Sequence, residues 1–585
     1  MKNIKSKFST RLNSTSGFRI AIFSLLLISF CKASFPQSIK DDKSNPGISF
    51  LKEDLKITTD RDVYIAGEEL WVKINIRNAF TSRPDNISKV VYLELLDRNN
   101  FPLKQIKISV DAGSCSTNMV LPDKVSTGNY ILRAYTGLLK NWSASDYAMR
   151  TISVINPFEN LDNTKLSDSI ASIIPQKSMN TKNGEVTCDI RINGEKFSPR
   201  QKINIDLAVK DNSFAPSDLS VSVIKSVLYN KYSEEIPVRP VNSGADNIVI
   251  AETLPETEGL LVSGSLRKKS NYEPLANTNV SLAYVGKTAR CQFTRTDGKG
   301  EFNFVVKETG RDEIVIQPLF TETSDYYVDL KQPFSSKFEA FRANLFLPDT
   351  NDIYELNRAV IAMQVNNIYA AERQKKTAVK IYPEFYGSSE NTVRMDDYIE
   401  LTTVHEAVKE IIPNVYVSKH DGVYDFKLIN KFNQIFENKP LVLLDGVPVY
   451  NMEKILDISA KEIERVDVIN TRYFFSDNVF DGIISFVTRK GNLSVLDFDN
   501  SIFRQVYDFC KDQETFYSPD YSTDNISLDR IPDYRNTLYW NPSVQTGPAG
   551  QLLLQYVLCK NDESPGIRGR MRGEELSASL FLHQA

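Results

Sequence analysis

Histidine, cysteine and tryptophan are scarce in this chain, whose 585 residues include three, six and three of them, respectively. Three histidines and six widely spread cysteines leave little material for histidine-based catalysis or for a Cys/His zinc site. An excess of either charge is also lacking, because 70 Lys+Arg face 74 Asp+Glu. A basic nucleic-acid binder and an acidic disordered protein are therefore both disfavoured. The composition favours a globular binding or scaffolding protein, with length for about three to five domains.

Long apolar runs are absent beyond Ile20–Cys31, and the segment Met1–Gly17 before this run has four basic residues and no acidic one. We predict a secretory signal peptide over residues 1–33, because such signals are basic and then apolar, and this run is too short to span about 30 Å of hydrocarbon. Cleavage after Ala33 suits signal peptidase, whereas acylation of Cys31 is an alternative that the bulky Phe30 disfavours. We expect a protein of the cell envelope, periplasmic or associated with the outer membrane.

Residues 50–157 contain short segments of alternating Val, Ile, Tyr and Leu separated by turns. This pattern predicts an antiparallel β-sandwich. Within it, the motif Asp60-x-x-x-Tyr64-x-x-Gly67-Glu68 precedes a strand and resembles the opening of macroglobulin-type sandwich domains. Gly67 gives the turn its backbone freedom and Tyr64 fills the core. The resemblance implies a fold and no catalytic site.

A fainter copy of the same motif follows, with Phe197 and Pro199 at the positions of Tyr64 and Ala66. A strand again follows at the same offset. We therefore predict a second macroglobulin-like β-sandwich over residues 180–252. Repetition of such a module is typical of binding or spacing proteins.

Residues 258–335 carry a Gly264-containing strand, then a Pro274-Leu275 segment, then an Asp-Gly turn at Asp297 between two β-rich runs. The Asp-Gly turn predicts a hairpin. The order of these segments resembles the small carboxypeptidase-regulatory-like β-sandwich, which implies a non-catalytic companion module. After it, apolar residues at helical spacing predict a helical connector over residues 350–376.

Residues 395–492 give the most specific match in the chain. A strand, an Asp-Gly turn and a second strand at Pro440–Val449 precede an alternating strand at Ile463–Ile469, and a further Asp-Gly turn at Asp481 precedes a closing strand. This order resembles the plug domain of TonB-dependent outer-membrane receptors. Too few residues follow Gly491 for the large barrel of such a receptor, so we expect a plug-like domain that cannot gate a pore of its own.

The tail at residues 493–585 contains the string Asp533 to Trp540, Asp-Tyr-Arg-Asn-Thr-Leu-Tyr-Trp. With the preceding modules, this string resembles a family of uncharacterised Gram-negative envelope proteins that combine macroglobulin-like, carboxypeptidase-regulatory-like and plug-like domains without a barrel. The resemblance implies that the tail begins another macroglobulin-like domain. Gly566–Gly573 does not continue that pattern, so the domain is either truncated or followed by a solvated basic tail.

Catalytic signatures are incomplete where they begin. The His-Glu pair at His405 lacks the second ligand of a zinc-protease helix, because Lys409 stands at that position. Gly286–Thr288 ends like a phosphate-binding loop, but Ser281 replaces its first glycine. The five cysteines beyond the signal peptide are an odd, widely spaced set without a disulfide framework or a thioester context. We expect no catalytic residues, no cofactor and no metal site.

The predicted fold class is mainly β and multi-domain, with tandem antiparallel β-sandwiches followed by an α+β plug-like domain. The expected function is non-enzymatic: interaction with envelope proteins, or scaffolding of them, at the outer membrane, without nucleic acid. An accessory component of TonB-dependent uptake, docking to a receptor or to the coupling machinery, is an alternative. An enzyme with an unrecognised site is a second alternative.

A candidate interaction edge is predicted at the alternating strand, with Ile463, Val466 and Val468 as its site residues. Exposed sheet edges accept a partner's strand, and alternation of apolar and charged residues is typical of such edges. A proline at Val466 is therefore expected to weaken recovery of a partner.

Overall fold

The computed structural model describes residues 48–159, 188–192, 202–209, 218–224, 235–236, 253–319, 325–339, 353–369, 380–398, 400–475, 478–496, 502–519, 533–545, 551–557 and 578–583. Over these residues the protein is mainly β and contains several separate sheets, which confirms the predicted fold class. No helix in this part of the chain is long and apolar enough to cross a membrane. Short 3-10 helices lie at Ile48–Leu51, Leu138–Asn141, Ala144–Asp146, Met395–Asp397 and Ala460–Glu462.

The first sandwich packs a sheet of order β1-β3-β6 against a sheet of order β12-β8-β7-β4-β5, with β2 paired in parallel to β8. Apolar side chains from both sheets, such as Leu70 and Leu93, are buried in one core. The alternation seen in the sequence therefore marks the strands correctly. Their bounds are β1 (Glu53–Thr59), β2 (Val63–Ile65), β3 (Glu69–Asn78), β4 (Val90–Leu96), β5 (Pro102–Ser109), β6 (Ser114–Val120), β7 (Gly128–Thr136), β8 (Ala148–Ile155) and β12 (Glu235–Ile236).

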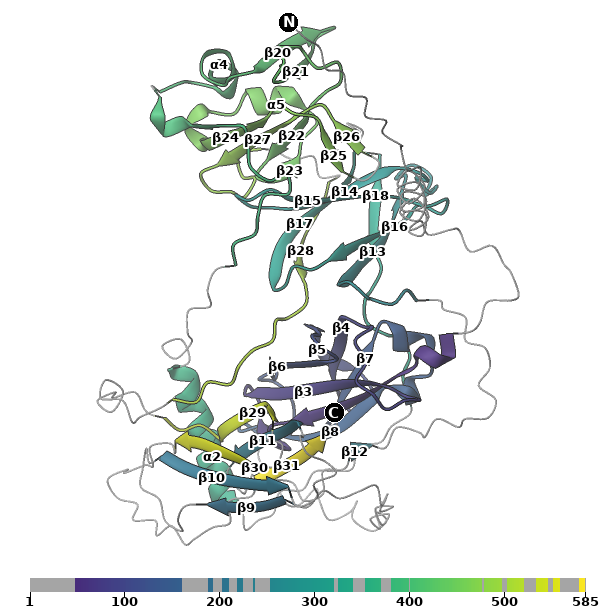
Figure 1. The fold of residues 1–585 in the computed structure, drawn as a ribbon, viewed down its shortest axis with the longest axis vertical. Helices are drawn as coiled ribbons and strands as arrows, with labels where there is room; N and C mark the ends of the chain where they lie inside the picture. The colour runs from purple at the N-terminus through teal and green to yellow at the C-terminus, as the bar shows by residue number, and fades with distance from the viewer. Residues whose placement is uncertain are drawn as a thin grey trace, which may run out of the picture. The chain divides into compact units, whose positions relative to one another are not determined.

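A second pair of sheets joins two distant parts of the chain. The strand orders are β30-β10-β9 and β29-β11-β31, so the blue strands β9–β11 lie among the yellow carboxyl-terminal strands in Figure 1. The segments predicted as a second sandwich (180–252) and as a separate tail (493–585) thus share both sheets. The bounds are β9 (Cys188–Ile192), β10 (Lys202–Val209), β11 (Asp218–Ile224), β29 (Thr537–Gln545), β30 (Gln551–Val557) and β31 (Ala578–His583).

The third sandwich lies in the predicted carboxypeptidase-regulatory-like segment and has sheets of order β16-β13-β18 and β15-β14-β17-β28. The predicted Asp-Gly turn forms, because Asp297 Oδ1 accepts from the backbone N–H groups of Lys299 and Glu301 at 2.8 Å each. Strand β28 arrives from far along the chain and extends the second sheet. The bounds are β13 (Leu260–Arg267), β14 (Asn279–Tyr284), β15 (Arg290–Arg295), β16 (Glu301–Val306), β17 (Arg311–Pro318), β18 (Tyr327–Leu330) and β28 (Phe503–Asp508).

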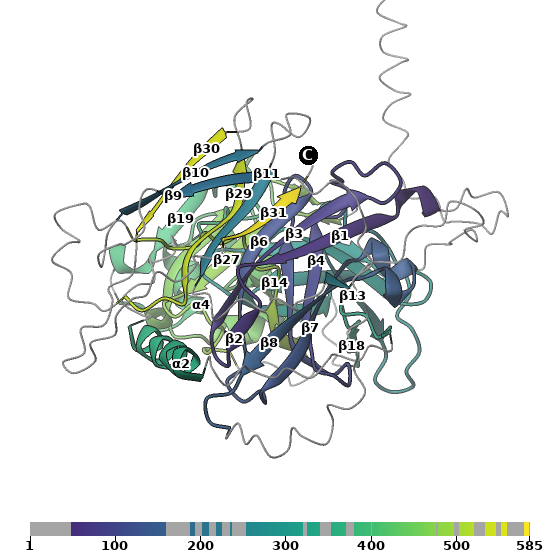
Figure 2. The same ribbon diagram turned by 90° about the horizontal axis from the view of Figure 1, so that it is seen from below.

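Helix α2 (Ile353–Ile368) lies within the predicted connector and packs on the first sandwich. Its buried residues Leu356, Ala359 and Met363 form a small apolar cluster with Val63 and Ile65 of β2. Figure 2 shows α2 beside β2. The helix is therefore a packed connector along its buried face.

The α+β module consists of the described residues between 380 and 496. Its sheet has the order β19-β24-β27-β22-β23, in which β22 and β27 run parallel and the other pairs are antiparallel. Two hairpins, β20–β21 and β25–β26, stand outside this sheet. The bounds are β19 (Asn391–Arg394), α4 (Val404–Glu410), β20 (Val415–His420), β21 (Val423–Leu428), β22 (Leu441–Leu444), β23 (Val447–Pro448), α5 (Met452–Leu456), β24 (Ile463–Ile469), β25 (Tyr473–Phe475), β26 (Asn478–Phe480) and β27 (Ile483–Thr488).

The segment that follows β28, residues 509–514, is called here the return segment, and it connects the edges of the first sandwich. Lys511 N donates to Lys107 O of β5 at 2.7 Å, and Ser109 N donates to Lys511 O at 3.1 Å. Glu514 N donates to Ser116 O of β6 at 3.2 Å. The return segment thus pairs with the edge strands of both sheets.

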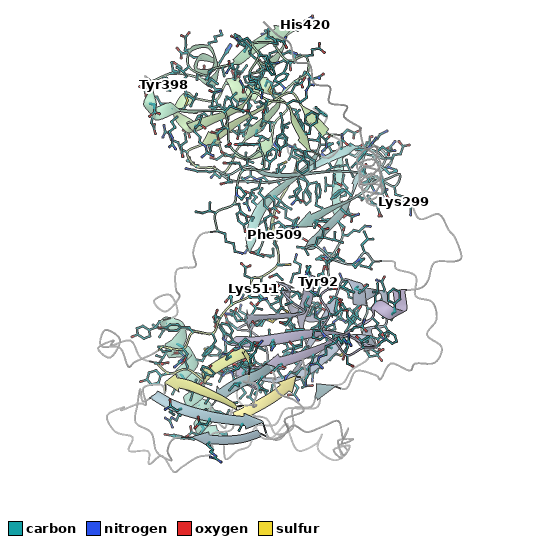
Figure 3. The ribbon with its side chains drawn as sticks, viewed as in Figure 1. Tyr92, Lys299, Tyr398, His420, Phe509 and Lys511 are labelled. Carbon is teal, nitrogen blue, oxygen red and sulfur yellow. The ribbon has the colours of Figure 1, made fainter. Side chains whose placement is uncertain are left out.

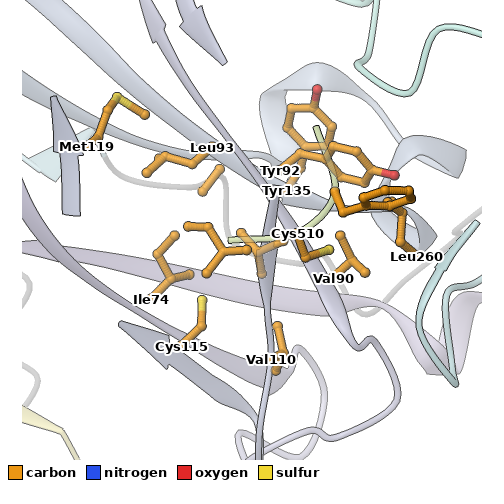
Figure 4. Packing of buried hydrophobic residues seen from close by; sticks show 14 of the residues in the cluster. Ile74, Val90, Tyr92, Leu93, Val110, Cys115, Met119, Tyr135, Leu260 and Cys510 are labelled. Carbon is orange, nitrogen blue, oxygen red and sulfur yellow. The ribbon is translucent and has the colours of Figure 1, made fainter. Parts of the chain in front are cut away.

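The return segment also reaches the third sandwich and the first core. Phe509 N donates to Gly310 O at 2.8 Å, and Gly310 N donates to Cys510 O at 2.9 Å. Figure 4 shows Cys510 among the buried residues of the first core, a cluster to which Leu260 of the third sandwich also belongs. Figure 3 labels Phe509 and Lys511. One short segment therefore links the first and third sandwiches.

Candidate functional site

The strand predicted as an interaction edge is β24, and it lies inside a sheet. β19 pairs with one of its sides and β27 with the other. The side chains of Ile463, Val466 and Val468 are buried, with exposed fractions of 0, 1 and 0%. This corrects the prediction of an exposed edge at these three residues. A proline at Val466 would interrupt an internal ladder and the core, so it would report stability rather than partner binding.

The contacts of the charged residues on β24 explain why the alternation of apolar and charged residues wrongly indicated an exposed edge. Arg465 Nε donates to Asp467 at 2.9 Å, and its Nη2 donates to Glu384 at 2.9 Å and to the carbonyl of Lys287 at 3.0 Å. Thr392 of β19 also donates to Asp467, at 2.7 Å. Burial raises the pKa of Glu384, and the nearby Arg465 opposes that shift. Arg465 and Asp467 on this strand therefore serve a partly buried network rather than a solvated face.

The Asp-Gly turn between β22 and β23 joins the α+β module to the third sandwich. Gly286 N donates to Asp445 O at 3.0 Å, and Gln317 Nε2 donates to Pro448 O at 2.7 Å. Gly446 has φ +79°, and a Cβ on it would stand 2.9 Å from Tyr284 O. This turn therefore requires glycine for both its backbone conformation and its close approach to β14.

An apolar core continues from the module into the third sandwich. The ring of Phe293 on β15 lies 5.1 Å from that of Phe475 and 5.3 Å from that of Phe480. Ala283 and Val315 of the third sandwich belong to the same buried cluster as the strands of the module. Because the core is shared, the module and the third sandwich are packed as one unit.

Gly286–Thr288, His405 and His420 drew attention in the sequence because of their residue types, and each contacts other residues of the protein. Gly286–Thr288, which ends like a phosphate-binding loop, is the turn that contacts Asp445. The His405 ring packs against Tyr424 at 5.8 Å, and His420 Nδ1 lies 3.0 Å from Asp421 at an exposed turn. Within the described ranges, no three His, Cys, Asp or Glu residues gather closely enough to hold a metal ion.

The motif at residues 60–68 forms a buried ion network. Asp60 Oδ1 accepts from Tyr64 Oη at 2.7 Å and from Trp71 N at 3.0 Å. Arg61 pairs with Glu68 at 2.9 Å, and its guanidinium carbon lies 4.6 Å from the centre of the Tyr64 ring. Burial raises the pKa of Asp60, while Arg61 opposes that shift. The motif thus brings charged groups into the first sandwich and pairs them there.

The same network holds the carboxyl-terminal string. Thr537 Oγ1 donates to Asp60 Oδ2, and Asn536 Nδ2 donates to Glu68 Oε1. Ser222 Oγ of β11 donates to Asp60 O at 2.6 Å. The two motifs that carry the strongest sequence signals in the first sandwich and in the tail therefore meet. Both strings are recognisable in the sequence, which carries no signal that they touch.

Glu53 at the start of β1 offers a pH test of the first sandwich. Burial raises its pKa to about 7; hydrogen bonds from Thr136 and Ser88 oppose this shift, and the charge of Asp85 adds to it. A carboxyl whose pKa rises on folding contributes stability that is complete below about pH 4.5 and is lost as the pH rises through about 7. We expect Glu53→Gln to remove this dependence.

The measurement is urea unfolding of both proteins at pH 5 and pH 8. From pH 5 to pH 8, wild type should lose about 3 kcal/mol relative to Glu53→Gln, because one pKa unit corresponds to about 1.4 kcal/mol. The exposed Glu258→Gln is the control and should follow wild type. Parallel pH profiles for wild type and Glu53→Gln would contradict the expectation.

Exposed apolar side chains are close together in sequence on one hairpin of the module and the loop after it. Tyr416 and Val423 on β20–β21 are 54 and 52% exposed, and Phe432 and Ile435 in the following loop are 72 and 63% exposed. Figure 3 labels His420 at the tip of this hairpin. Large exposed apolar side chains that gather in one region are typical of interaction surfaces.

No protein-family model and no curated protein matches the chain. Among solved structures, it is similar to native Escherichia coli alpha-2-macroglobulin, with 10% identity, coverage of 89% of this chain and 40% of that chain, and a TM-score of 0.19. For Salmonella alpha-2-macroglobulin reacted with methylamine, the values are 11%, 50%, 24% and 0.15. For the Yersinia pseudotuberculosis adhesin InvE, they are 11%, 47%, 57% and 0.13. The matched region spans about a quarter of the Salmonella protein, and likenesses of this size identify no family.

Proposed function

We propose that this chain is an exported, non-enzymatic protein of the cell envelope that binds or scaffolds other envelope proteins at the outer membrane. The observation that supports this most is the exposed apolar surface of hairpin β20–β21 and its loop. A module whose core is continuous with the third sandwich presents that surface. Because the module is packed against the third sandwich, its surface is already ordered before a partner binds. This limits the conformational entropy that is lost on binding.

The hydrogen bonds of the aspartates in the sequence motifs also favour a structural role for these residues over a catalytic one. Asp60 accepts hydrogen bonds from Tyr64, Trp71 and Thr537, and Asp445 accepts from Thr488 and a neighbouring amide. A carboxylate whose oxygens are engaged in this way stabilises the fold, whereas a general base needs an oxygen within reach of substrate. The carboxylates of these motifs therefore act within the fold, where they accept hydrogen bonds from other parts of the chain.

Site-specific photo-crosslinking in envelope fractions of the source cells tests the proposal. A photoreactive residue is placed at Tyr416 or Phe432 on the module, and at Phe101 or Tyr272 on the first and third sandwiches as position controls. We expect discrete protein adducts from the module positions and none from the controls. Adducts with a barrel receptor would favour the accessory role in uptake. Absence of adducts at every position would contradict a binding function.

A further inference from the structure

A small cavity opens in the α+β module between β21, β22 and α5. Its volume is about 220 Å³. Phe426, Leu441, Val442 and Met452 line it with apolar surface. The ion pair of Asp425 and Lys439, at 2.7 Å, contributes the charged part of the lining. We call this feature the 425–439 pocket.

The volume of the 425–439 pocket narrows the kind of occupant. Small-molecule and cofactor sites are typically about 300–1,000 Å³, which is larger than this cavity. A single large side chain is a closer match, and aromatic residues are the commonest anchors in protein interfaces. The size and the apolar lining therefore fit one aromatic side chain of a polypeptide.

The outer face of hairpin β20–β21 continues from the pocket. The register pairs Tyr416 with Lys427, Ser418 with Asp425, and His420 with Val423, and these cross-strand pairs share one face because side chains alternate along a strand. Asp425 lines the pocket, so the exposed Tyr416 and Val423 lie on the face that leads to it. A bound segment can thus contact apolar surface outside the pocket as well.

Positive charge borders the same surface. Lys427 Nζ donates to the backbone carbonyl of Glu437 at 2.8 Å, and Lys431 Nζ lies 5.8 Å from the centre of the Phe432 ring. In the part of the chain that the structure describes, neither of these two ammonium groups is paired with a carboxylate. The side chain of Lys439 is 59% exposed, and its ammonium group pairs with Asp425. The surface is therefore complementary to acidic side chains.

We propose that the 425–439 pocket and the outer face of β20–β21 bind a polypeptide segment that places an aromatic side chain in the pocket and acidic side chains beside the lysines. This inference rests on the proposed binding function and assigns its contact surface and the chemistry of its partner. The aromatic anchor supplies apolar burial, and the flanking carboxylates replace water around Lys427, Lys431 and Lys439.

Fluorescence anisotropy of labelled synthetic peptides on the intact chain tests this. The probe is Glu-Asp-Trp-Glu-Asp, with Glu-Asp-Ala-Glu-Asp and Lys-Lys-Trp-Lys-Lys as comparison peptides. We expect saturable binding of the probe, at least tenfold weaker binding of the alanine peptide, and no binding of the basic one. Raising the salt concentration should weaken binding of the probe, because exposed charges are screened. No saturable binding of the probe would overturn the proposal.

Two variants locate the binding. Met452→Trp fills the pocket and Lys439→Glu reverses its exposed charge, and each should weaken binding of the probe at least tenfold. The matched control Lys299→Glu, in the exposed turn between β15 and β16 that Figure 3 labels, should leave it unchanged. Thermal unfolding shows whether Met452→Trp folds, and Lys439→Glu, altered at the surface, tests the pocket regardless.

Equal affinity of wild type and Lys439→Glu for the probe would overturn the assignment to this pocket. This result would reject only the pocket, and it can be distinguished from failure of the proposed binding function. Crosslinked adducts from Tyr416 or Phe432 in envelope fractions, together with failure of both pocket variants to alter probe binding, would keep the binding function and reject the pocket.

Discussion

Replacing Asp60 by alanine is expected to lower the free energy of unfolding by about 5 kcal/mol. Asp60 is fully buried and accepts from Tyr64, Trp71 and Thr537 while it lies beside Arg61. Removing one member of a buried charged network costs about 3–5 kcal/mol, and Arg61 would lose its neighbour at 3.5 Å while Glu68 remains paired with it. Three donors also lose their acceptor, which places the change at the upper end of that range. Urea unfolding monitored by circular dichroism measures it.

The same substitution should loosen the tail. Thr537 begins β29, so loss of its acceptor weakens the attachment of β29 to the first sandwich. Tryptic cleavage after Arg535 should become faster in Asp60→Ala than in wild type. Asp329→Ala on the exposed side of β18 is the control and should change stability by less than about 0.5 kcal/mol. A loss below about 1 kcal/mol for Asp60→Ala, with unchanged cleavage, would show that the network does not hold the tail.

Asp445→Ala is expected to destabilise the protein by about 4 kcal/mol. Asp445 is fully buried, and its carboxylate accepts from Thr488 N at 2.7 Å, Thr488 Oγ1 at 2.8 Å and Leu493 N at 2.8 Å. Each buried donor left without an acceptor costs about 1–3 kcal/mol, and the costs within one cluster are not fully additive. Thermal and urea unfolding measure the loss.

The chain offers a matched control for this substitution. Asp421 also stands in an Asp-Gly turn and has φ +50°, close to the +46° of Asp445. Its side chain is 89% exposed, so Asp421→Ala reports the backbone cost of alanine at positive φ without loss of buried hydrogen bonds. We expect a loss of about 1 kcal/mol for Asp421→Ala. Equal losses for the two variants would show that the Asp445 carboxylate adds nothing.

Local strand positions could be predicted well from the sequence, because alternation is a short-range property. The predicted strand Ile463–Ile469 coincides with β24. Strand neighbours could not be predicted in the same way. β19, whose residues are Asn-Thr-Val-Arg, shows too little alternation to be recognised, yet it covers the side of β24 that was taken as an edge. The error was one of pairing rather than of secondary structure.

The ion network illustrates the same limit for the candidate site. The spacing from Asp60 to Glu68 identified a turn and a core tyrosine, and Tyr64 is indeed fully buried. The carboxyl-terminal members of the network, Asn536 and Thr537, stand 468 and 477 positions away from Glu68 and Asp60, the residues that they contact. A single sequence contains no relation between such distant residues. The exposure of side chains could not be predicted from the sequence either, because the lysines and aromatic residues at 416–435 form no recognisable motif.

The sharing of the second pair of sheets between distant segments has a consequence for biosynthesis. A ribosome adds about 5–20 residues per second, so the 313 positions between Ile224, where β11 ends, and Thr537, where β29 begins, correspond to roughly 15–65 s of synthesis. During that interval β10 and β11 have been made but β29, β30 and β31 have not, and their unpaired edges can join with other chains. Until β29, β30 and β31 are made, β10 and β11 therefore lack the neighbours that complete their sheets.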